Sequence, residues 1–287
     1  MISATSKLCA VIGDPVSHSV SPEIHNSAFQ ACGLDLVYVA FHVRQGDVER
    51  ALEGVRSLGI RGLSVTIPHK VDIIPYLDEL DEASRNIGSV NTVVNEGDRL
   101  VGYSTDGPGA MRALAAEGVE VGGRNVLLLG SGGAARAVAF ALAAFESPPR
   151  LRILGVEEEE LEDLGSDLKR KTRIPTSTRS LSSEHLTEAM ADAEVVIHAT
   201  PIGMSPKFDE TLVASHLIRA DQVVFDIVYT PLETRLLQEA RAAGAVTVAG
   251  LGMFVYQAAI QFELWTGEDA PVELMTETVR KALGEGT

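Results

Sequence analysis

The sequence contains few cysteines and few positive charges, and each shortage excludes a class of protein. Only two of the 287 residues are cysteines, Cys9 and Cys32, which cannot form a metal site by themselves and indicate a reducing compartment. We expect both to be small apolar core residues. Lysine and arginine total 24 against 40 aspartates and glutamates, and the net charge of −16 at pH 7 disfavours nucleic acid or an anionic membrane as a partner. Any anionic ligand must be held by local groups.

The chain also lacks the apolar segments that export or membrane insertion requires. Residues 1–7, MISATSK, have no apolar core of a signal peptide, which predicts a cytoplasmic protein. Residues 242–262 carry no charge and are long enough to cross a bilayer, but glycines and the polar Gln257 and Gln261 interrupt them. We therefore expect no membrane span. The hydrophobic content of 45% predicts a folded protein with room for two domains.

Strand-like and helix-like segments alternate along the chain, which indicates an α/β fold. In the first hundred residues the pattern predicts strands at 8–13, 36–43 and 61–67, helices at 21–32 and 46–59, and a hairpin over 90–104 that turns at 96–98. A second series predicts strands at 125–130, 151–155, 194–200, 222–228 and 245–250, with an alanine-rich helix, an acidic helix and a helix at 233–243 between them. This second series is typical of a doubly wound parallel sheet, the Rossmann type.

Two further helices, 254–265 and 272–283, end the chain with no strand after them. We expect them to pack against the first domain. The expected domains are therefore 1–106 together with 251–287, and 107–250.

A glycine-rich turn follows the first strand of the second series. Gly130, Gly132 and Ala135 have the G-x-G-x-x-A spacing between an apolar strand and a helix, the context in which this motif binds a dinucleotide. The first glycine permits the tight turn, the second lets the backbone approach a pyrophosphate, and the alanine permits close helix packing. A tight turn without a ligand is the alternative.

Two serines precede a predicted helix near the amino terminus. Ser21 followed by Pro22 is an ordinary helix start, with the serine as N-cap. Together with Ser19, the same geometry makes an anion site, because two hydroxyls flank the positive end of the helix.

A lysine follows the strand pattern of residues 61–67. Pro68 cannot donate to a sheet, so we expect Lys70 to lie where the chain leaves the strand. A solvated surface lysine is the alternative. Four more polar residues lie near strand ends or turns, where each taken singly is an ordinary turn or cap residue: Asn91, Thr92, Thr105 and Asp106.

The order of these motifs resembles the shikimate dehydrogenase family over essentially the whole chain. The matching stretches are HSVSP at 18–22, VTIPHK at 65–70, GSVNTV at 88–93 with STDG at 104–107, GSGGAARA at 130–137 with HATPIGM at 198–204, and GLGMFVYQAAIQFELWTG at 250–267. The resemblance implies an α/β substrate domain and a Rossmann NAD(P) domain with a cleft between them. It also implies the reversible reduction of 3-dehydroshikimate to shikimate in the chorismate pathway.

The resemblance also assigns roles to residues of this chain. Lys70 and Asp106 would be the catalytic pair, which handles the proton when hydride reaches a ketone. No metal is needed, and we interpret His18, His69 and His198 as framework residues. The substrate, a cyclohexene carboxylic acid, would contact Ser19, Ser21, Thr66, Asn91, Asp106, Tyr229 and Gln257. The cofactor would contact Gly130, Ser131, Gly132, Gly133, Ala134, Glu157, Thr200 and Gly250.

The chain departs from the family at three places. Ser64 and Ser104 stand where asparagine is usual, and a shorter side chain without an amide would alter contacts if both border one pocket. After the second Rossmann strand, NADP-dependent members commonly have Asn-Arg-Thr, whereas this chain has Gly155, Val156 and Glu157. Because a 2′-phosphate is usually bound by arginine, we expect NAD to be used at least as well as NADP.

A carboxylate at this position could bind the ribose hydroxyls of NAD, and Glu157 is the candidate. Alternatively, the run Glu157 to Glu160 only complements a helix dipole, and Arg152 or Arg173 reaches a phosphate from nearby. Other functions stay open as well. They are a quinate/shikimate or aminoshikimate dehydrogenase, a paralogue that binds ligand without turnover, and, for assembly, a homodimer.

Overall fold

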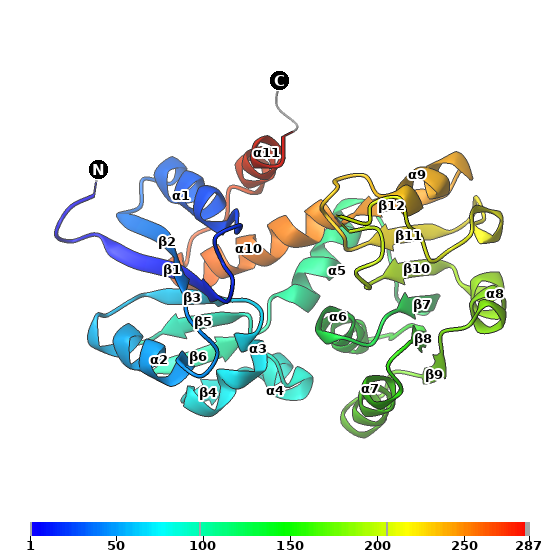
Figure 1. Ribbon diagram of the computed structural model, residues 1–287, viewed down its shortest axis with the longest axis horizontal. Coiled ribbons are helices and arrows are strands. Elements are labelled where there is room, and N and C mark those ends of the chain that lie inside the picture. Colours follow the sequence, from blue (N-terminus) through cyan, green and yellow to red (C-terminus); the bar gives the residue numbers. More distant parts are fainter. Residues whose placement is uncertain (1, 98, 205, 285–287) are drawn as a thin grey trace. The chain divides into compact units, whose positions relative to one another are not determined.

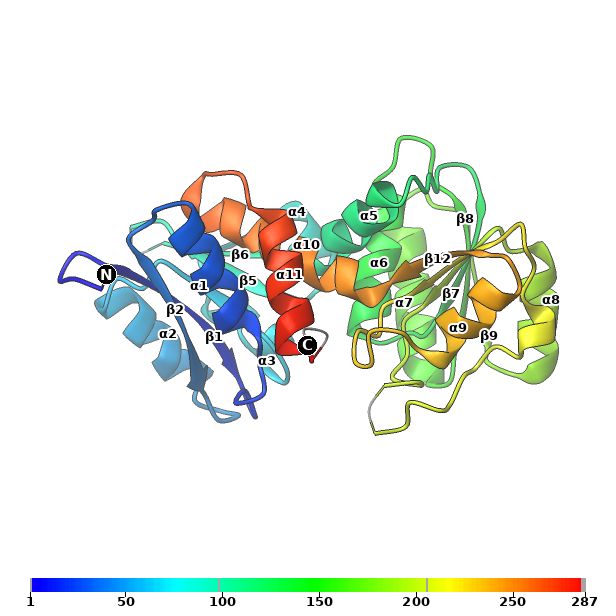
Figure 2. The same cartoon turned by 90° about the horizontal axis from the view of Figure 1, so that it is seen from above.

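The computed structural model describes residues 2–97, 99–204 and 206–284, and these form two compact units. The first unit comprises the described residues of 1–105 and 255–287, and the second comprises 106–254. Each unit has its own sheet, as Figures 1 and 2 show. Within the described ranges, no helix is both long enough and apolar enough to cross a membrane.

The first unit contains a mixed sheet in the order β2-β1-β3-β5-β6-β4. The strands β1, β2 and β3 run parallel, and the β5–β6 hairpin joins β3 in the antiparallel sense. The strands are β1 (Lys7–Gly13), β2 (Leu36–His42), β3 (Gly62–Val65), β4 (Glu79–Leu80), β5 (Thr92–Asn95) and β6 (Leu100–Tyr103). The predicted hairpin is confirmed, but its turn includes residue 98, which lies outside the described residues.

Helices from both ends of the chain pack together in the first unit. The helix α1 (Ser21–Ala31) contacts α11 (Val272–Ala282), where the hydroxyls of Ser27 and Thr278 lie 3.1 Å apart. The remaining helices are α2 (Val48–Ser57), α3 (His69–Asp72), α4 (Glu82–Ile87) and the part of α10 (Gly250–Thr266) that follows residue 254.

The last turn of α10 packs directly on the backbone of the sheet. The indole N–H of Trp265 donates to the Val93 carbonyl at 3.1 Å, and its ring lies over Gly62, where a Cβ would stand 2.1 Å from the indole nitrogen. Gly62 is therefore required for α10 to approach this closely. The Arg61 guanidinium links the end of α10 to β5, because it donates to the carbonyls of Trp265 and Asn95, both at 2.8 Å.

The second unit is a parallel, doubly wound sheet in the order β12-β11-β10-β7-β8-β9, which confirms the predicted Rossmann type. Its strands are β7 (Asn125–Leu129), β8 (Arg150–Gly155), β9 (Thr176–Ser180), β10 (Val195–His198), β11 (Val223–Asp226) and β12 (Val246–Ala249). Its helices are α5 (Asp106–Ala116), α6 (Gly133–Ala143), α7 (Glu158–Lys171), α8 (Ser183–Asp192) and α9 (Arg235–Ala242). Adjacent residues of β9 face different helices. Thr178 packs on Gly165 of α7, and Arg179 donates to Glu188 of α8 at 2.9 Å.

Several local features differ from the sequence-based expectations. Lys70 lies not at the end of a strand but in the one-turn helix α3, because β3 already ends at Val65. The helix α10 begins at Gly250, four residues earlier than expected. Cys9 is buried as predicted, whereas Cys32 is exposed at the end of α1 and is not a core residue. The strands β4 and β9 and the helices α4 and α8 were not predicted.

Candidate active site

Several candidate substrate residues meet at one edge of the first sheet. The backbone N–H of Thr66 donates to the Ile12 carbonyl at 3.0 Å, next to the carboxyl end of β1. The Asn91 carbonyl accepts from the last residue of β3 at 2.7 Å, and the Lys70 carbonyl accepts from Val90 N–H at 2.8 Å. Thr66, Lys70 and Asn91 are thereby held as neighbours by backbone hydrogen bonds.

The Asn91 amide is 3% exposed, and its orientation is fixed by its partners. Its Oδ1 accepts from the backbone N–H of Thr105 and from the hydroxyl of Thr92, both at 2.8 Å, and its Nδ2 donates to the Thr105 hydroxyl at 2.9 Å. Asp106 follows Thr105 directly and begins α5. Asn91 thus fixes the end of the segment that leads to the candidate catalytic aspartate.

The two serines of the predicted anion site lie together at the start of α1. The Ser19 hydroxyl donates to the Ser21 hydroxyl at 3.1 Å and accepts from the Ser21 N–H at 3.3 Å. The N-cap residue of α1 is Val20, which makes no side-chain capping bond, and Ser21 is the first helical residue, so the predicted N-cap role of Ser21 is wrong. This arrangement places two hydroxyls at the amino end of α1, as the predicted anion site requires.

The remaining candidates for substrate contact and catalysis are divided between the two units. Half-buried Lys70 and Gln257 belong to the first unit, whereas Asp106 and Tyr229 belong to the second, so a Lys70–Asp106 pair stays a prediction. Burial raises the pKa of the Tyr229 phenol, whose ring stacks on Phe254 at 4.3 Å. A phenol in this state is a hydrogen-bond donor at neutral pH.

Ser64, one of the two serines that replace asparagine, is turned towards protein groups. It is 7% exposed, accepts from the Tyr38 hydroxyl at 2.6 Å, and donates to Gln261 Oε1 at 2.7 Å. Ser104 is also buried. Sequence reasoning missed Gln261 as a partner of Ser64; its only signal was its spacing of one helical turn from Gln257.

The glycine-rich turn has the geometry that a dinucleotide needs. Gly130 has a φ of 117°, and a Cβ there would stand 2.6 Å from the Ala199 carbonyl oxygen. Gly132 precedes α6 in an extended conformation and provides no side-chain cap, while Ala135 is fully buried. This geometry agrees with a pyrophosphate site at the N-terminus of α6, and the contacts of the individual residues with the cofactor stay predictions.

A buried network supports the strand ends next to this turn. His198 contacts the carboxylate of Asp226 at 2.9 Å and the hydroxyl of Thr200 at 2.5 Å, and Thr234 donates to the same carboxylate at 2.6 Å. His198 is thus a framework residue, and so is buried His69, whose ring contacts the Val43 carbonyl at 2.7 Å. Sequence reasoning missed Asp226, the fully buried centre of this network.

Gly250, a cofactor candidate, directly follows β12 and packs against the backbone of the two residues after β11. A Cβ at Gly250 would stand 2.3 Å from the Ile227 carbonyl oxygen and 2.5 Å from that of Val228. Only glycine lets α10 begin this close to the backbone.

A carboxylate of the acidic run reaches the glycine-rich turn. It belongs to Glu160, in the first turn of α7, whose Oε2 accepts from the Ser131 hydroxyl at 3.2 Å. Gly155 makes room for this contact, because a Cβ there would stand 2.8 Å from the Ser131 oxygen. Glu157, the residue named from the sequence, is exposed at the N-cap position without a capping bond.

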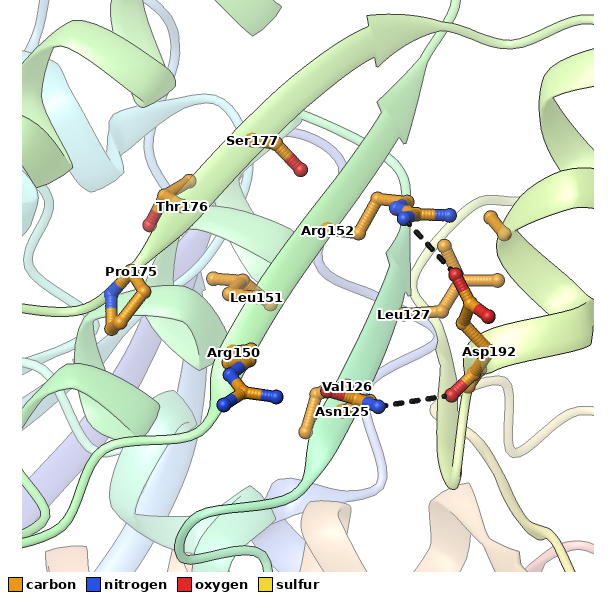
Figure 3. A pocket seen from close by; sticks show the side chains of 12 residues that line it. Asn125, Val126, Leu127, Arg150, Leu151, Arg152, Pro175, Thr176, Ser177 and Asp192 are labelled. Atoms are coloured by element: carbon orange, nitrogen blue, oxygen red, sulfur yellow. Dashed lines mark hydrogen bonds and ion pairs between the residues drawn. The ribbon is translucent and has the colours of Figure 1, made fainter.

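The two arginines considered for a 2′-phosphate lie towards the other edge of the sheet. Arg152 lines a cavity of about 540 Å³ at the amino edge of β7, β8 and β9 (Figure 3), where its guanidinium contacts Asp192 at 3.4 Å and Glu188 at 3.9 Å. Arg173 is exposed in the connection that precedes β9. The glycine-rich turn follows the carboxyl end of β7, so both arginines are at the wrong edge for that phosphate.

Within the described parts of the chain, no group of three or more histidine, cysteine, aspartate or glutamate residues could hold a metal ion. A Rossmann sheet with this glycine-rich turn, joined to an α/β unit whose sheet edge carries hydroxyls, an amide and a lysine, is typical of nicotinamide-dependent oxidoreductases.

Comparisons with known proteins identify the family. Residues 11–93 match the shikimate dehydrogenase substrate binding domain, and residues 250–280 match the shikimate 5'-dehydrogenase C-terminal domain. The chain is 44% identical over 279 residues to the shikimate dehydrogenase (NADP(+)) of Symbiobacterium thermophilum, covering 96% of this chain and 95% of that relative. The protein belongs to the shikimate dehydrogenase family, as the sequence motifs predicted.

Solved structures of relatives share the fold. The shikimate 5-dehydrogenase of Listeria monocytogenes, in complex with shikimate and NAD, matches with a TM-score of 0.93 and 35% identity over 97% of this chain and 98% of that one. A shikimate dehydrogenase in complex with NADP+ matches with a TM-score of 0.91 and 41% identity over 99% of this chain and 98% of that one. The quinate dehydrogenase of Corynebacterium glutamicum, in complex with NAD, matches with a TM-score of 0.89 and 30% identity. This match covers 96% of this chain and 99% of that one.

Proposed function

We propose that this protein is a shikimate dehydrogenase, which reversibly reduces 3-dehydroshikimate to shikimate with NAD(P)H. The observation that carries the proposal is the sheet edge of the first unit, where backbone hydrogen bonds hold Thr66, Lys70 and Asn91 as neighbours. The names of the full-length relatives agree with it.

In this proposal the candidate residues divide the tasks of the reaction. Ser19 and Ser21 donate to the substrate carboxylate, while Thr66, Asn91 and Gln257 bind the ring hydroxyls. When bound, the nicotinamide cofactor supplies the hydride. Lys70 stabilises the negative charge that develops on the ketone oxygen and donates a proton to it, and Asp106 orients Lys70.

Steady-state kinetics with a panel of substrates tests the proposal. Shikimate, quinate and aminoshikimate are each oxidised with NAD and with NADP, and we expect the highest kcat/KM for shikimate. A higher value for quinate or aminoshikimate would favour a side-pathway dehydrogenase. Binding of shikimate without turnover would favour a non-catalytic paralogue.

Replacing Ser19 with alanine is expected to raise KM for shikimate with little change in kcat. A charge-assisted hydrogen bond to the carboxylate is lost in ground state and transition state alike, at a cost of roughly 1 to 3 kcal/mol. Ser17→Ala, an exposed serine of the same loop, is the matched control. An unchanged KM in Ser19→Ala would mean that the carboxylate binds elsewhere.

We further propose that NAD is used at least as well as NADP, although several relatives are named for NADP(+). In place of an arginine the chain has Val156, which is 73% exposed, and the nearby Glu160 carboxylate contacts the glycine-rich turn. A 2′-phosphate brings nearly two negative charges next to that carboxylate. Glu157 is proposed to accept hydrogen bonds from the ribose hydroxyls.

Replacing Glu160 with glutamine is therefore expected to raise kcat/KM for NADP about tenfold, roughly 1.4 kcal/mol, with little change for NAD. Glu162→Gln makes the same charge change farther along α7 and controls for net charge. A wild-type kcat/KM for NADP more than tenfold above that for NAD would contradict the cofactor proposal.

A cytoplasmic location and a homodimer stay predictions from the sequence.

A further inference from the structure

A chain of hydrogen bonds runs through the interior of the first unit and ends on Asn91. The Tyr38 hydroxyl donates to the Ser64 hydroxyl at 2.6 Å, and Ser64 donates to Gln261 Oε1 at 2.7 Å. Gln261 Nε2 donates to the Thr92 hydroxyl at 2.9 Å, and Thr92 donates to Asn91 Oδ1 at 2.8 Å. All five side chains are buried.

The Gln261 amide fixes the direction of this chain. An amide nitrogen can only donate and an amide oxygen can only accept. Since Gln261 Nε2 donates to the Thr92 oxygen, the single hydroxyl hydrogen of Thr92 is left for Asn91 Oδ1. Gln261 Nε2 also lies 3.3 Å from the Asn91 carbonyl, so the same amide holds the backbone of that residue.

We infer that Gln261 is a positioning residue for substrate recognition, which acts through Thr92 and Asn91 and presents the Asn91 amide to a ring hydroxyl of the substrate. This inference rests on the proposed function. Gln261 itself is 3% exposed, and its amide is used by Ser64, Thr92 and the Asn91 backbone. It contributes to specificity because it leaves the Thr92 hydrogen for Asn91 Oδ1 and holds the Asn91 backbone, which supports the amide orientation that the Thr105 N–H also requires.

Two variants of Gln261 separate its polarity from its volume. Gln261→Met keeps the approximate size and removes both hydrogen-bonding ends. Gln261→Glu keeps the shape but replaces the amide donor with a carboxylate acceptor. The Thr92 hydroxyl can then donate to residue 261, and its hydrogen bond to Asn91 Oδ1 is lost. We expect both variants to raise KM for shikimate at least fivefold, with less change in kcat and none in KM for the nicotinamide cofactor.

Gln222 of the second unit provides a matched control for lost stability. It is also fully buried, and its Nε2 donates to the carbonyls of Met190 and Ala193, both at 2.9 Å. Gln222→Met therefore removes comparable buried hydrogen bonds at a site remote in sequence from the substrate motifs. We expect its Tm to fall as in Gln261→Met while its KM for shikimate stays within twofold of wild type.

Turnover of shikimate by the wild-type protein is measured first, because its absence would overturn the proposed function and this inference together. With wild-type turnover established, a shikimate KM within twofold of wild type in both Gln261 variants would overturn the inference alone. An equal rise of KM in Gln222→Met would also overturn it, because the effect would then follow general destabilisation.

Discussion

Replacing Lys70 with alanine is expected to lower kcat for shikimate oxidation by on the order of 10²-fold or more, with little change in KM. Hydride transfer changes the charge on the substrate oxygen, and the lysine side chain stabilises that charge and exchanges a proton with it. These interactions are strongest in the transition state, so their loss appears in kcat.

The measurement is steady-state kinetics with saturating cofactor on wild type, Lys70→Ala and Lys281→Ala. Lys281 lies in α11, where its ammonium contacts Glu277, and its replacement controls for the loss of one positive charge. A wild-type kcat in Lys70→Ala would remove this residue from the mechanism.

Acid is expected to destabilise the first unit through one buried histidine. His25 is fully buried, its ring stacks on Tyr38 at 4.5 Å and lies 5.0 Å from the ring of Trp265. Within the described residues, neither ring nitrogen has a hydrogen-bond partner of good geometry. Burial lowers the pKa of His25 from 6.5 to about 3, and the nearby Gln261 side chain opposes this shift without cancelling it.

The direction of the effect follows from the two protonation states. Below pH 6.5 the unfolded chain takes up a proton that the folded imidazole does not, so the stability present above this pH is lost as pH falls towards 3. Between pH 7 and 4.5 the loss is about 3 kcal/mol in the free energy of unfolding.

Urea unfolding at a series of pH values, followed by the fluorescence of Trp265, checks this expectation. Trp265 is the only tryptophan of the chain and lies beside His25, so its signal reports on the first unit. His25→Phe keeps an aromatic ring and cannot titrate, so its pH dependence should be weaker by that amount. Equal pH dependence in wild type and variant would contradict the expectation, because it would show that His25 titrates alike in the folded and unfolded states.

The sequence predicted those parts of the fold in which apolar periodicity is strong. The parallel strands β7, β8, β10 and β11 are mostly buried and apolar, and the pattern located all of them. The strand β9 was missed because it is an edge strand of sequence TSTRS, without an apolar residue. The predicted start of α10 was four residues too late, because glycines usually break helices. In the structure Gly250 begins the helix, since only glycine permits the close packing there.

The candidate site was predicted where short motifs carry it and missed where its support comes from distant segments. Lys70, Asn91 and the two serines stand in contiguous motifs. The side-chain partners of Gln261 lie on β3 and at the start of β5, and the partner of Glu160 lies in the turn after β7. No local pattern brings these residues together, since the packing of α10 and α7 on their sheets creates the contacts.

Isotope transfer tests the central claim most directly. The wild-type protein is incubated with 3-dehydroshikimate and a reduced nicotinamide cofactor that carries deuterium at the transferred position. The product is then analysed by NMR. We expect shikimate with one deuterium on the carbon that carried the ketone, and far less of it from Lys70→Ala in the same time. Unchanged 3-dehydroshikimate with the wild-type protein, or shikimate without deuterium at that carbon, would contradict the account.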